Sequence, residues 1–409
     1  MMELLAPAGN REKLELAVAY GADAVYLGGD DFSLRNQSGN FSLPELKEAI
    51  TFAHAANVKV YLACNIYPRN FEVAAIGDFL KAAAALEPDA FIIADVGVLQ
   101  LSRKVAPQIP IHLSTQANTT SYAAVQFWRQ FNVTRVNMAR ELSLEEIAAI
   151  HAEVPEMELE AFVHGAMCIS HSGRCLMSSF MANRDSNRGL CAHPCRWQYY
   201  LVEELRPGQY HPVMEDKHGT YFFNSHDLCM LPYLDKMLQS GVSSLKIEGR
   251  MKTVHYLGTV LRVYREALDV CLANPQNYKV RQEWLDELEI VNTRGYTTGF
   301  YLGDQAALAP AYDNPKYQPE WLFAGKVLSA GMSGAVLVEA RNQLCLDDEI
   351  MVINPRRTEI KHYILKKIES VDKGSIQVLN GSQQAYLELI GADESNEIDA
   401  LSLIRKRIK

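Results

Sequence analysis

The segment Glu3-Leu4-Leu5-Ala6-Pro7-Ala8-Gly9-Asn10 opens the series of alternating patterns that decides the fold. Its first four residues are typical of a short buried strand, and the Pro, Gly and Asn that follow are turn residues. A helical pattern then runs from about Arg11 to Tyr20, and a second apolar run covers Ala24–Leu27. A strand, a helix and another strand in close succession indicate two parallel strands joined by a crossover helix.

The same strand–helix unit recurs along the chain. The predicted strands are Glu3–Ala6, Ala24–Leu27, Lys59–Asn65, Ala90–Asp95, Ile111–Thr115, Arg135–Ala139, Glu158–Val163 and, after a long gap, Ser244–Glu248. Eight such units predict an α/β fold, a (β/α)8 TIM-like barrel. A doubly wound open sheet is the main alternative, but the turn after the first strand lacks the G-x-G-x-x-G pattern of a dinucleotide-binding fold.

The pattern changes after about residue 320, where short segments alternate apolar and polar residues between turns. This alternation is typical of a small all-β domain. In a barrel, an insertion before the eighth strand lies over the face where chemistry takes place. We therefore predict a TIM-like barrel over residues 1–273 with a Cys-rich insertion at about 164–243, a helical linker over 274–319, and a small C-terminal all-β barrel domain over 320–409.

The composition is ordinary for a globular protein, with 48% hydrophobic and 22% charged residues. No apolar run approaches the roughly 18 residues of a membrane helix. The N-terminal residues also lack the features of a signal peptide, so we expect a cytoplasmic protein that contacts no membrane. The net charge of −9 argues weakly against bulk binding of nucleic acid. The basic tail Arg405–Lys409 is a candidate for a local patch, and a frayed, solvated terminus is its alternative.

Five of the eight cysteines lie in the predicted insertion, namely Cys168, Cys175, Cys191, Cys195 and Cys229. In a reducing cytosol, clustered cysteines favour metal or redox chemistry over structural disulfides. The first four have the spacing C-x6-C-x15-C-x3-C, and four thiolates are what a [4Fe-4S] cluster requires. We therefore predict that such a cluster is bound by Cys168, Cys175, Cys191 and Cys195.

Alternatives stay open for these cysteines. Zinc sites of four cysteines usually contain two closely spaced pairs, and only Cys191–Cys195 has that form. Buried, unligated cysteines are the other alternative. Arg174, Arg188 and Arg196 flank the cysteines, and their charge would lower the thiol pKa values and offset an anionic cluster. Cys229 either replaces one of the four ligands or is a small core residue, and we favour the core.

Polar residues at the carboxyl ends of barrel strands point into the active site. The densest group is Lys246-Ile247-Glu248-Gly249-Arg250, in which alternation places Lys246 and Glu248 on one face. We predict that these two residues and Arg250 bind a small carboxylate and take part in catalysis. An ion-pair network that closes the barrel is the alternative. His164 is a candidate general acid or base, or a hydrogen-bond donor beside the cluster. The other candidates are Asn65, Asp95, Ser114, Gln116, Asn118 and Arg140.

Several segments strongly resemble peptidase family U32. They are Glu3–Asn10, Gly21-Ala22-Asp23-Ala24-Val25-Tyr26, Ser172-Gly173-Arg174-Cys175 and Lys246-Ile247-Glu248-Gly249-Arg250-Met251-Lys252. The resemblance extends over nearly the whole chain, and both the cysteine motif and the K-I-E-G-R motif are specific. The C-terminal β segment is similar to a barrel domain that is appended in that family.

The resemblance implies an oxygen-independent hydroxylase that carries a [4Fe-4S] cluster, with the same four cysteines as ligands. Members of the family act on ubiquinone precursors, on a ribosomal RNA cytidine or on the wobble uridine of tRNA. In the RNA-directed branches, prephenate is implied as the hydroxyl source. The C-terminal domain and the segment Asn224–Cys229 are most similar to the tRNA branch, which implies formation of 5-hydroxyuridine with tRNA as the partner. The fourth cysteine is placed differently in the ubiquinone branch, so Cys229 stays a candidate ligand.

Two other functions are alternatives. The family name suggests collagenase-like proteolysis, although the sequence contains no H-E-x-x-H zinc-protease motif and no G-x-S-x-G nucleophile motif. A non-catalytic protein that binds a cluster or acts as an RNA chaperone is the third interpretation.

Overall fold

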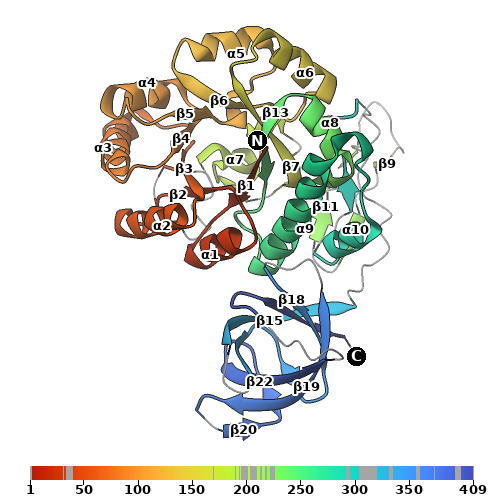
Figure 1. The fold of residues 1–409 in the computed structure, drawn as a ribbon. Coiled ribbons are helices and arrows are strands. Elements are labelled where there is room, and N and C mark those ends of the chain that lie inside the picture. The colour runs from red at the N-terminus through yellow and green to blue at the C-terminus, as the bar shows by residue number, and fades with distance from the viewer. Residues whose placement is uncertain are drawn as a thin grey trace.

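The computed structural model forms two barrels, the smaller one at the C-terminal end and blue in Figure 1. It describes residues 2–30, 32–33, 40–168, 170–188, 190–192, 194, 226–291, 295–303, 320–330, 335–355, 360–372, 374–391 and 398–408, and the backbone of four short strands, β8 (Leu201–Val202), β9 (Tyr210–His211), β10 (Met214–Asp216) and β11 (Gly219–Tyr221).

Eight parallel strands close the larger barrel. They are β1 (Glu3–Pro7), β2 (Ala24–Gly28), β3 (Lys59–Cys64), β4 (Ala90–Ile93), β5 (Ile111–Leu113), β6 (Val133–Asn137), β7 (Glu158–Ala166) and β13 (Val242–Ile247). Neighbouring strands pair in parallel, and β13 pairs with β7 on one side and with β1 on the other. This pairing closes the sheet, so the predicted TIM-like barrel is confirmed and the open sheet is excluded.

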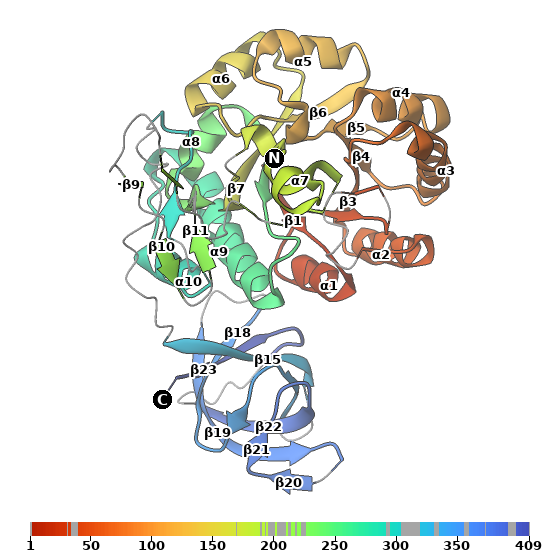
Figure 2. The ribbon, with the colours of Figure 1, turned by 180° about the vertical axis from the view of Figure 1, so that it is seen from behind.

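Helices cover the outside of this barrel, as Figures 1 and 2 show from opposite sides. They are α1 (Arg11–Ala19), α2 (Leu43–Ala55), α3 (Val73–Ala84), α4 (Val96–Val105), α5 (Tyr122–Arg129), α6 (Leu144–Glu153), α8 (Leu234–Gln239) and α9 (Val254–Ala273). The main hydrophobic core lies between strands and helices, with Leu4 and Leu27 from strands and Leu14 and Leu261 from helices fully buried. Of the helices that the structure describes, none combines the length and apolar character that a membrane span requires.

Side-chain caps fix where several helices begin. Asn10 Oδ1 accepts a hydrogen bond from the Lys13 amide at 2.9 Å at the start of α1. Asp95 caps α4 by accepting from the amides of Gly97 at 2.8 Å and Val98 at 3.0 Å. A cap satisfies amides that have no partner inside the helix. These two caps let the helices begin within a few residues of the strand ends, so the loops there stay short.

The insertion between β7 and β13 supplies the elements above the barrel mouth. Its helix α7 (Met177–Ala182) lies across the barrel in both views (Figures 1 and 2). Strand β12 (Asp227–Cys229) pairs antiparallel with the end of β7 and places Cys229 opposite His164. After α10 (Gln282–Glu289), the short strand β14 (Tyr296–Thr297) pairs in parallel with β12. Segments on both sides of the eighth strand therefore extend the sheet beside the end of β7.

Six antiparallel strands form the smaller barrel. They are β15 (Trp321–Ala330), β16 (Val336–Ala340), β18 (Glu349–Ile353), β19 (Lys361–Ser370), β22 (Gln384–Gly391) and β23 (Leu403–Arg407). The sheet is closed because β18 pairs with both β19 and β23. A separate core fills it, with Val327, Val338 and Leu365 fully buried. The predicted C-terminal all-β barrel is confirmed.

The basic tail is built into the contact between the two barrels. Arg405, in β23, is fully buried and donates hydrogen bonds to both carboxylate oxygens of Glu287, at 2.9 and 3.0 Å. It also donates to Thr259 Oγ1 at 2.9 Å and to His255 Nε2 at 2.7 Å. Burial, with the nearby Arg405 charge, holds the pKa of His255 well below its usual value. The structure corrects both expectations for residues 405–408, because Arg405 is buried and Lys406 and Arg407 pair with carboxylates.

Replacing Arg405 should destabilise the protein far more than replacing Arg407 two positions away. In Arg405→Ala, Glu287 stays buried and keeps a longer 3.4 Å contact with Arg262, and breaking a buried ion pair costs about 3–5 kcal/mol. Arg407 forms exposed pairs with Glu320 and Glu349, so Arg407→Ala should change stability little. Urea midpoints of the two variants measure the difference, and equal midpoints would contradict this account.

Candidate active site at the barrel mouth

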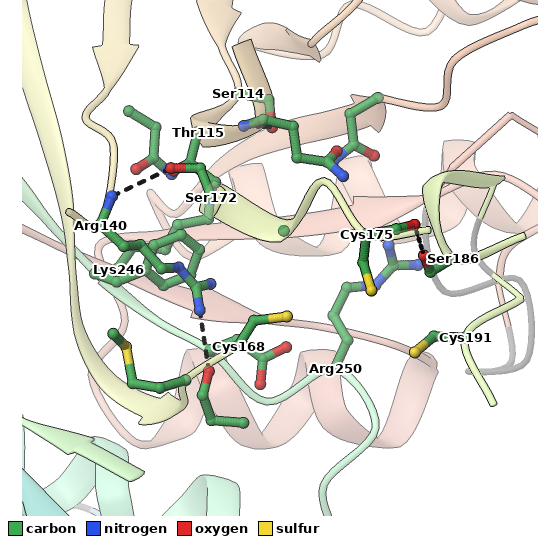
Figure 3. Close-up of a pocket in the computed structure, with 18 of the residues that line it drawn as sticks. Ser114, Thr115, Arg140, Cys168, Ser172, Cys175, Ser186, Cys191, Lys246 and Arg250 are labelled. Atoms are coloured by element: carbon green, nitrogen blue, oxygen red, sulfur yellow. Dashed lines mark hydrogen bonds between the residues drawn. The ribbon is translucent and has the colours of Figure 1, made fainter. Parts of the chain in front are cut away.

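A cavity of about 440 Å³ lies at the carboxyl ends of the barrel strands (Figure 3). This volume falls in the range of sites that bind small molecules. Most of the residues predicted from strand ends line it, together with cysteines of the insertion. The lining includes Tyr26, Asn65, Ser114, Gln116, Arg140, Cys168, Cys175, Cys191, Lys246, Glu248, Arg250 and Lys252.

Lys246 lies at the cavity floor and binds a buried carboxylate. Its Nζ is 2.7 Å from Glu160 Oε1, which also accepts a hydrogen bond from Asn137 Nδ2 at 2.8 Å. The ammonium lies 4.5 Å from the centre of the Tyr26 ring. The next residue, Ile247, is fully buried in the core outside the strands. The inward direction predicted for Lys246 is therefore correct, and its partner Glu160 comes from the neighbouring strand β7.

Further charges continue this network toward the other end of the barrel. Arg135 lies 3.5 Å from Glu160 Oε2 and 2.5 Å from Glu3 Oε1. Glu3 also accepts hydrogen bonds from the Tyr61 hydroxyl at 2.6 Å and from Ser244 Oγ at 2.8 Å. Burial by itself raises the pKa of Glu3, but Arg135 and the hydroxyl donors outweigh it and lower the pKa. A line of alternating charges thus runs through the barrel and ends at Lys246.

The upper part of the cavity is rich in cationic side chains. Arg140 donates to the Ala166 carbonyl at 3.0 Å, and its guanidinium lies 3.9 Å from the centre of the Phe162 ring. Arg250 donates to Asn40 Oδ1. The charged residues that line the cavity are Arg140, Lys246, Glu248, Arg250 and Lys252. Among the described residues of the lining, four are cationic and one is a carboxylate, which suits an anionic ligand.

Three of the predicted cluster ligands line the same cavity. Cys168 follows β7, and Cys175 and Cys191 belong to the insertion; Figure 3 shows their sulfur atoms around one space. Cys195 lies outside the described residues, as does Arg196. Among the residues that are described, no three His, Cys, Asp or Glu side chains converge closely enough to hold a metal ion. Three thiols that line one cavity, together with arginine and lysine side chains, have the donor chemistry that an iron–sulfur cluster requires.

Hydrogen bonds of the insertion fix the backbone that carries Cys175. Asn187 Nδ2 donates to the Cys175 carbonyl at 2.9 Å, and Asn187 Oδ1 accepts from the Cys175 amide at 3.2 Å. Ser186 Oγ donates to the same carbonyl at 2.6 Å. Ser172 has a left-handed backbone (φ 44°), and Glu141 accepts hydrogen bonds from its amide and its hydroxyl, both at 2.5 Å. The position of the thiol therefore depends on side chains that are not themselves candidate ligands.

His164 does not line the cavity. Its ring packs outside the strands at 5.3 Å from both Tyr264 and Tyr296, and neither ring nitrogen has a hydrogen-bond partner among the described residues. Burial lowers its pKa to about 3. Cys229, opposite His164, is buried in the same core, where burial raises its pKa to about 11. This placement favours the core interpretation of Cys229.

Two other predicted residues also lie elsewhere. Asp95 serves as the cap of α4, and Asn118 contacts His171 Nδ1. Sequence reasoning missed Glu160 and Lys252. A glutamate alternating with Phe162 in an apolar strand, and a lysine two positions after the K-I-E-G-R motif, are the patterns that could have identified them.

Comparison with known proteins then gives the family. Residues 9–309 match the model of peptidase family U32. This chain belongs to peptidase family U32. A U32 relative named tRNA hydroxylation protein P1, from Bacillus subtilis strain 168, is 38% identical over 363 residues, which cover 88% of this chain and 86% of that protein. A Helicobacter pylori protein (strain 26695) named tRNA hydroxylation protein P is 44% identical over 305 residues, 74% and 72% of the two chains. A Porphyromonas gingivalis protein (strain W83) named collagenase is 28% identical over 391 residues, 91% and 92% of the two chains.

The buried His164 should make the stability of this U32 protein fall in acid. The unfolded chain takes up a proton at His164 near its usual pKa of about 6.5, whereas the folded protein does so only near 3. The contribution of neutral His164 to the free energy of unfolding is therefore fully present above about pH 6.5. It is lost progressively as the pH falls toward 3, at up to about 1.4 kcal/mol per pH unit.

His164→Phe removes this proton and keeps a ring among the tyrosines. Its unfolding free energy should fall less steeply between pH 6 and pH 4 than that of the wild type. Urea midpoints across this range measure the slope, and parallel curves for the two proteins would contradict the buried, neutral histidine. Above pH 7 the two curves should run in parallel, which serves as the internal control.

Proposed function

We propose that this U32 protein is a tRNA-modifying hydroxylase that forms 5-hydroxyuridine at the wobble position without molecular oxygen. The observation that carries the proposal is the 38% identity, over 88% of this chain, to a protein named for tRNA hydroxylation. The 44% identity to a second protein named in the same way supports it. A cavity at the barrel mouth, lined by basic side chains and three thiols, is consistent with this chemistry.

The cationic lining supports a small carboxylate as co-substrate, with prephenate as the proposed hydroxyl source. Arg140 and Arg250 have the planar geometry that binds a carboxylate through two hydrogen bonds. Lys246 and Lys252 add charge without that geometry. Replacing the C5 hydrogen of uridine by a hydroxyl is a two-electron oxidation of the ring. The C–O bond of the hydroxyl source breaks, the source is reduced by these two electrons, and a proton leaves C5. Glu248 is the carboxylate among the charged residues of the cavity lining, so the proposal assigns that proton to it.

The proposal gives the three cavity cysteines and Cys195 the role of ligands to a [4Fe-4S] cluster. Such a cluster supplies one-electron redox chemistry when it is bound. Around it, Asn187 and Ser186 would keep Cys175 in place, and Arg174 would offset the negative charge of the thiolates. The proposal assigns no proton transfer to His164, because that side chain lies outside the cavity.

A peptidase is the second candidate, and the relative named collagenase is the observation that favours it. Hydroxylation of a ribosomal RNA cytidine or of a ubiquinone precursor would use the same cavity. These alternatives differ from tRNA hydroxylation in the molecule that is changed, so a nucleoside measurement separates them.

Deleting the gene should abolish the 5-hydroxyuridine-derived wobble nucleosides of tRNA, measured by mass spectrometry of digested tRNA. The wild-type gene should restore them. Glu248→Gln should restore them about 100-fold more slowly, because loss of an acid or base typically costs 10²–10⁴-fold in rate. Arg407→Ala, at the exposed edge of the smaller barrel, is the control that should restore them fully. Unchanged tRNA nucleosides would end this proposal, and a lost ribosomal cytidine modification would redirect it.

Protein purified without oxygen should contain iron and sulfide in equal amounts, with broad visible absorption. Cys175→Ser and Cys168→Ser should lose most of both, because each removes a proposed ligand. Cys345→Ser, in the short strand β17 (Leu344–Cys345) of the smaller domain, is the matched control and should keep them. Cys229→Ser should also keep them if Cys229 is a core residue. Zinc in place of iron, or no metal, would contradict the cluster.

A further inference from the structure

A ridge at the edge of the cavity combines exposed apolar side chains with arginines. We call it the mouth ridge and define it as residues 67–72, which follow β3, together with Arg174, Leu176 and Arg188. Phe71 is 79% exposed and Leu176 is 76% exposed, the two largest values among the exposed large hydrophobic residues of the described chain. Leu176 lies between two residues of the cavity lining, Cys175 and Met177, so this exposed apolar side chain is next to the cavity.

Hydrogen bonds and ion pairs tie this ridge to the cavity wall. Arg174 Nε donates to the Tyr67 hydroxyl at 3.0 Å and to the carbonyl of Gln116, a lining residue, at 2.7 Å. Glu72, next to Phe71, forms an ion pair with Arg188. Arg188 directly follows Asn187, whose side chain donates a hydrogen bond to the Cys175 carbonyl. Leu176 is the next residue after Cys175. Phe71 therefore lies in a short segment that is tied to the cavity wall through Tyr67 before it and Glu72 after it.

The charge of the ridge suits a polyanion. Arg69 and Arg174 are exposed, and Arg188 is partly exposed beside Glu72, the one carboxylate of the ridge. The Arg174 guanidinium lies 5.3 Å from the centre of the Tyr67 ring. Surfaces that bind single-stranded RNA combine aromatic rings with arginines, because bases stack on the rings and phosphates contact the cations.

The geometry points to a nucleobase-binding site on the mouth ridge, where an unpaired nucleoside next to the target stacks on Phe71 while Arg69 contacts its phosphate. This inference rests on the proposed RNA substrate and adds how that RNA is held. It explains why an aromatic ring lies in solvent beside a cavity. It also places RNA recognition on a local basic surface, which an overall charge of −9 does not forbid.

The test uses the full-length protein and an anticodon stem-loop RNA with 2-aminopurine on either side of the wobble uridine. Phe71→Ala should weaken binding about 5- to 150-fold, the range expected for one stacked base. It should also abolish the quenching of the 2-aminopurine that stacks. Phe71→Trp should bind like the wild type, and Phe71→Leu should bind like Phe71→Ala, because it keeps the apolar contact and removes the flat ring.

The salt dependence of RNA affinity distinguishes the contribution of charge from that of base stacking. Arg69→Ala should lower the slope of log affinity against log salt by about 1, whereas Phe71→Ala should leave the slope unchanged. Phe127→Ala, on the outer helix α5, is the matched control because that side chain is 48% exposed and lies outside the cavity lining. It should bind RNA like the wild type.

The outcomes distinguish the inference from the proposed function. If the wild type hydroxylates the RNA and Phe71→Ala binds as tightly as the wild type, the inference is overturned alone. If Phe71→Leu binds like the wild type, the ridge makes an ordinary apolar contact, as a protein partner would, and the stacking site is overturned. A wild type that binds no tRNA-derived RNA overturns both. Unchanged urea midpoints for the Phe71 variants exclude misfolding as the cause of weak binding.

Discussion

The line of charges inside the barrel is the constraint on which the mouth depends. Glu3, Arg135, Glu160 and Lys246 come from four different strands, and a buried charge that loses its partner costs several kcal/mol. The pairs form only in the register that places Lys246 beside Leu5 of β1. The strand pairing that closes the barrel therefore also places the Lys246 ammonium group at the cavity floor. Lys246 belongs to this ion-pair network and also lines the cavity, so the network does not exclude the ligand-binding role that is proposed for it.

Much of the fold could be predicted because its patterns are local. Each strand of the larger barrel is a short apolar run bounded by turn residues, and all eight predicted strands are present. Lys246, Glu248 and the three described cysteines line one cavity because strand ends and one insertion meet at one face of a barrel. The partners of these residues were harder to predict. Glu160 pairs with Lys246 across 86 positions of sequence, and no local pattern encodes that distance.

The surroundings of His164 and Arg405 could not be predicted from local sequence patterns. Simple alternation from Glu160 and Phe162 would point His164 into the cavity, but the pairing of β7 with β13 shifts register between Phe162 and His164. Such a bulge adds a residue to one strand and redirects the side chains that follow it, so His164 meets the tyrosines of the outer layer instead. Arg405 is similar, because a basic tail indicates a solvated end unless a buried carboxylate far along the chain accepts it. In both cases tertiary packing decides what the sequence leaves open.

The buried Arg405 also sets the spacing of the molecule. Its hydrogen bonds join the smaller barrel to α9 and α10, the last helices packed on the larger barrel, and the Tyr20 hydroxyl adds a bond to the Ile353 carbonyl at 2.9 Å. These hydrogen bonds hold the two barrels at a fixed separation, whereas a flexible linker alone would let the distance between them vary. A long, rigid ligand that contacts both barrels must therefore match the distance between them, and a ligand of a different length contacts only one barrel.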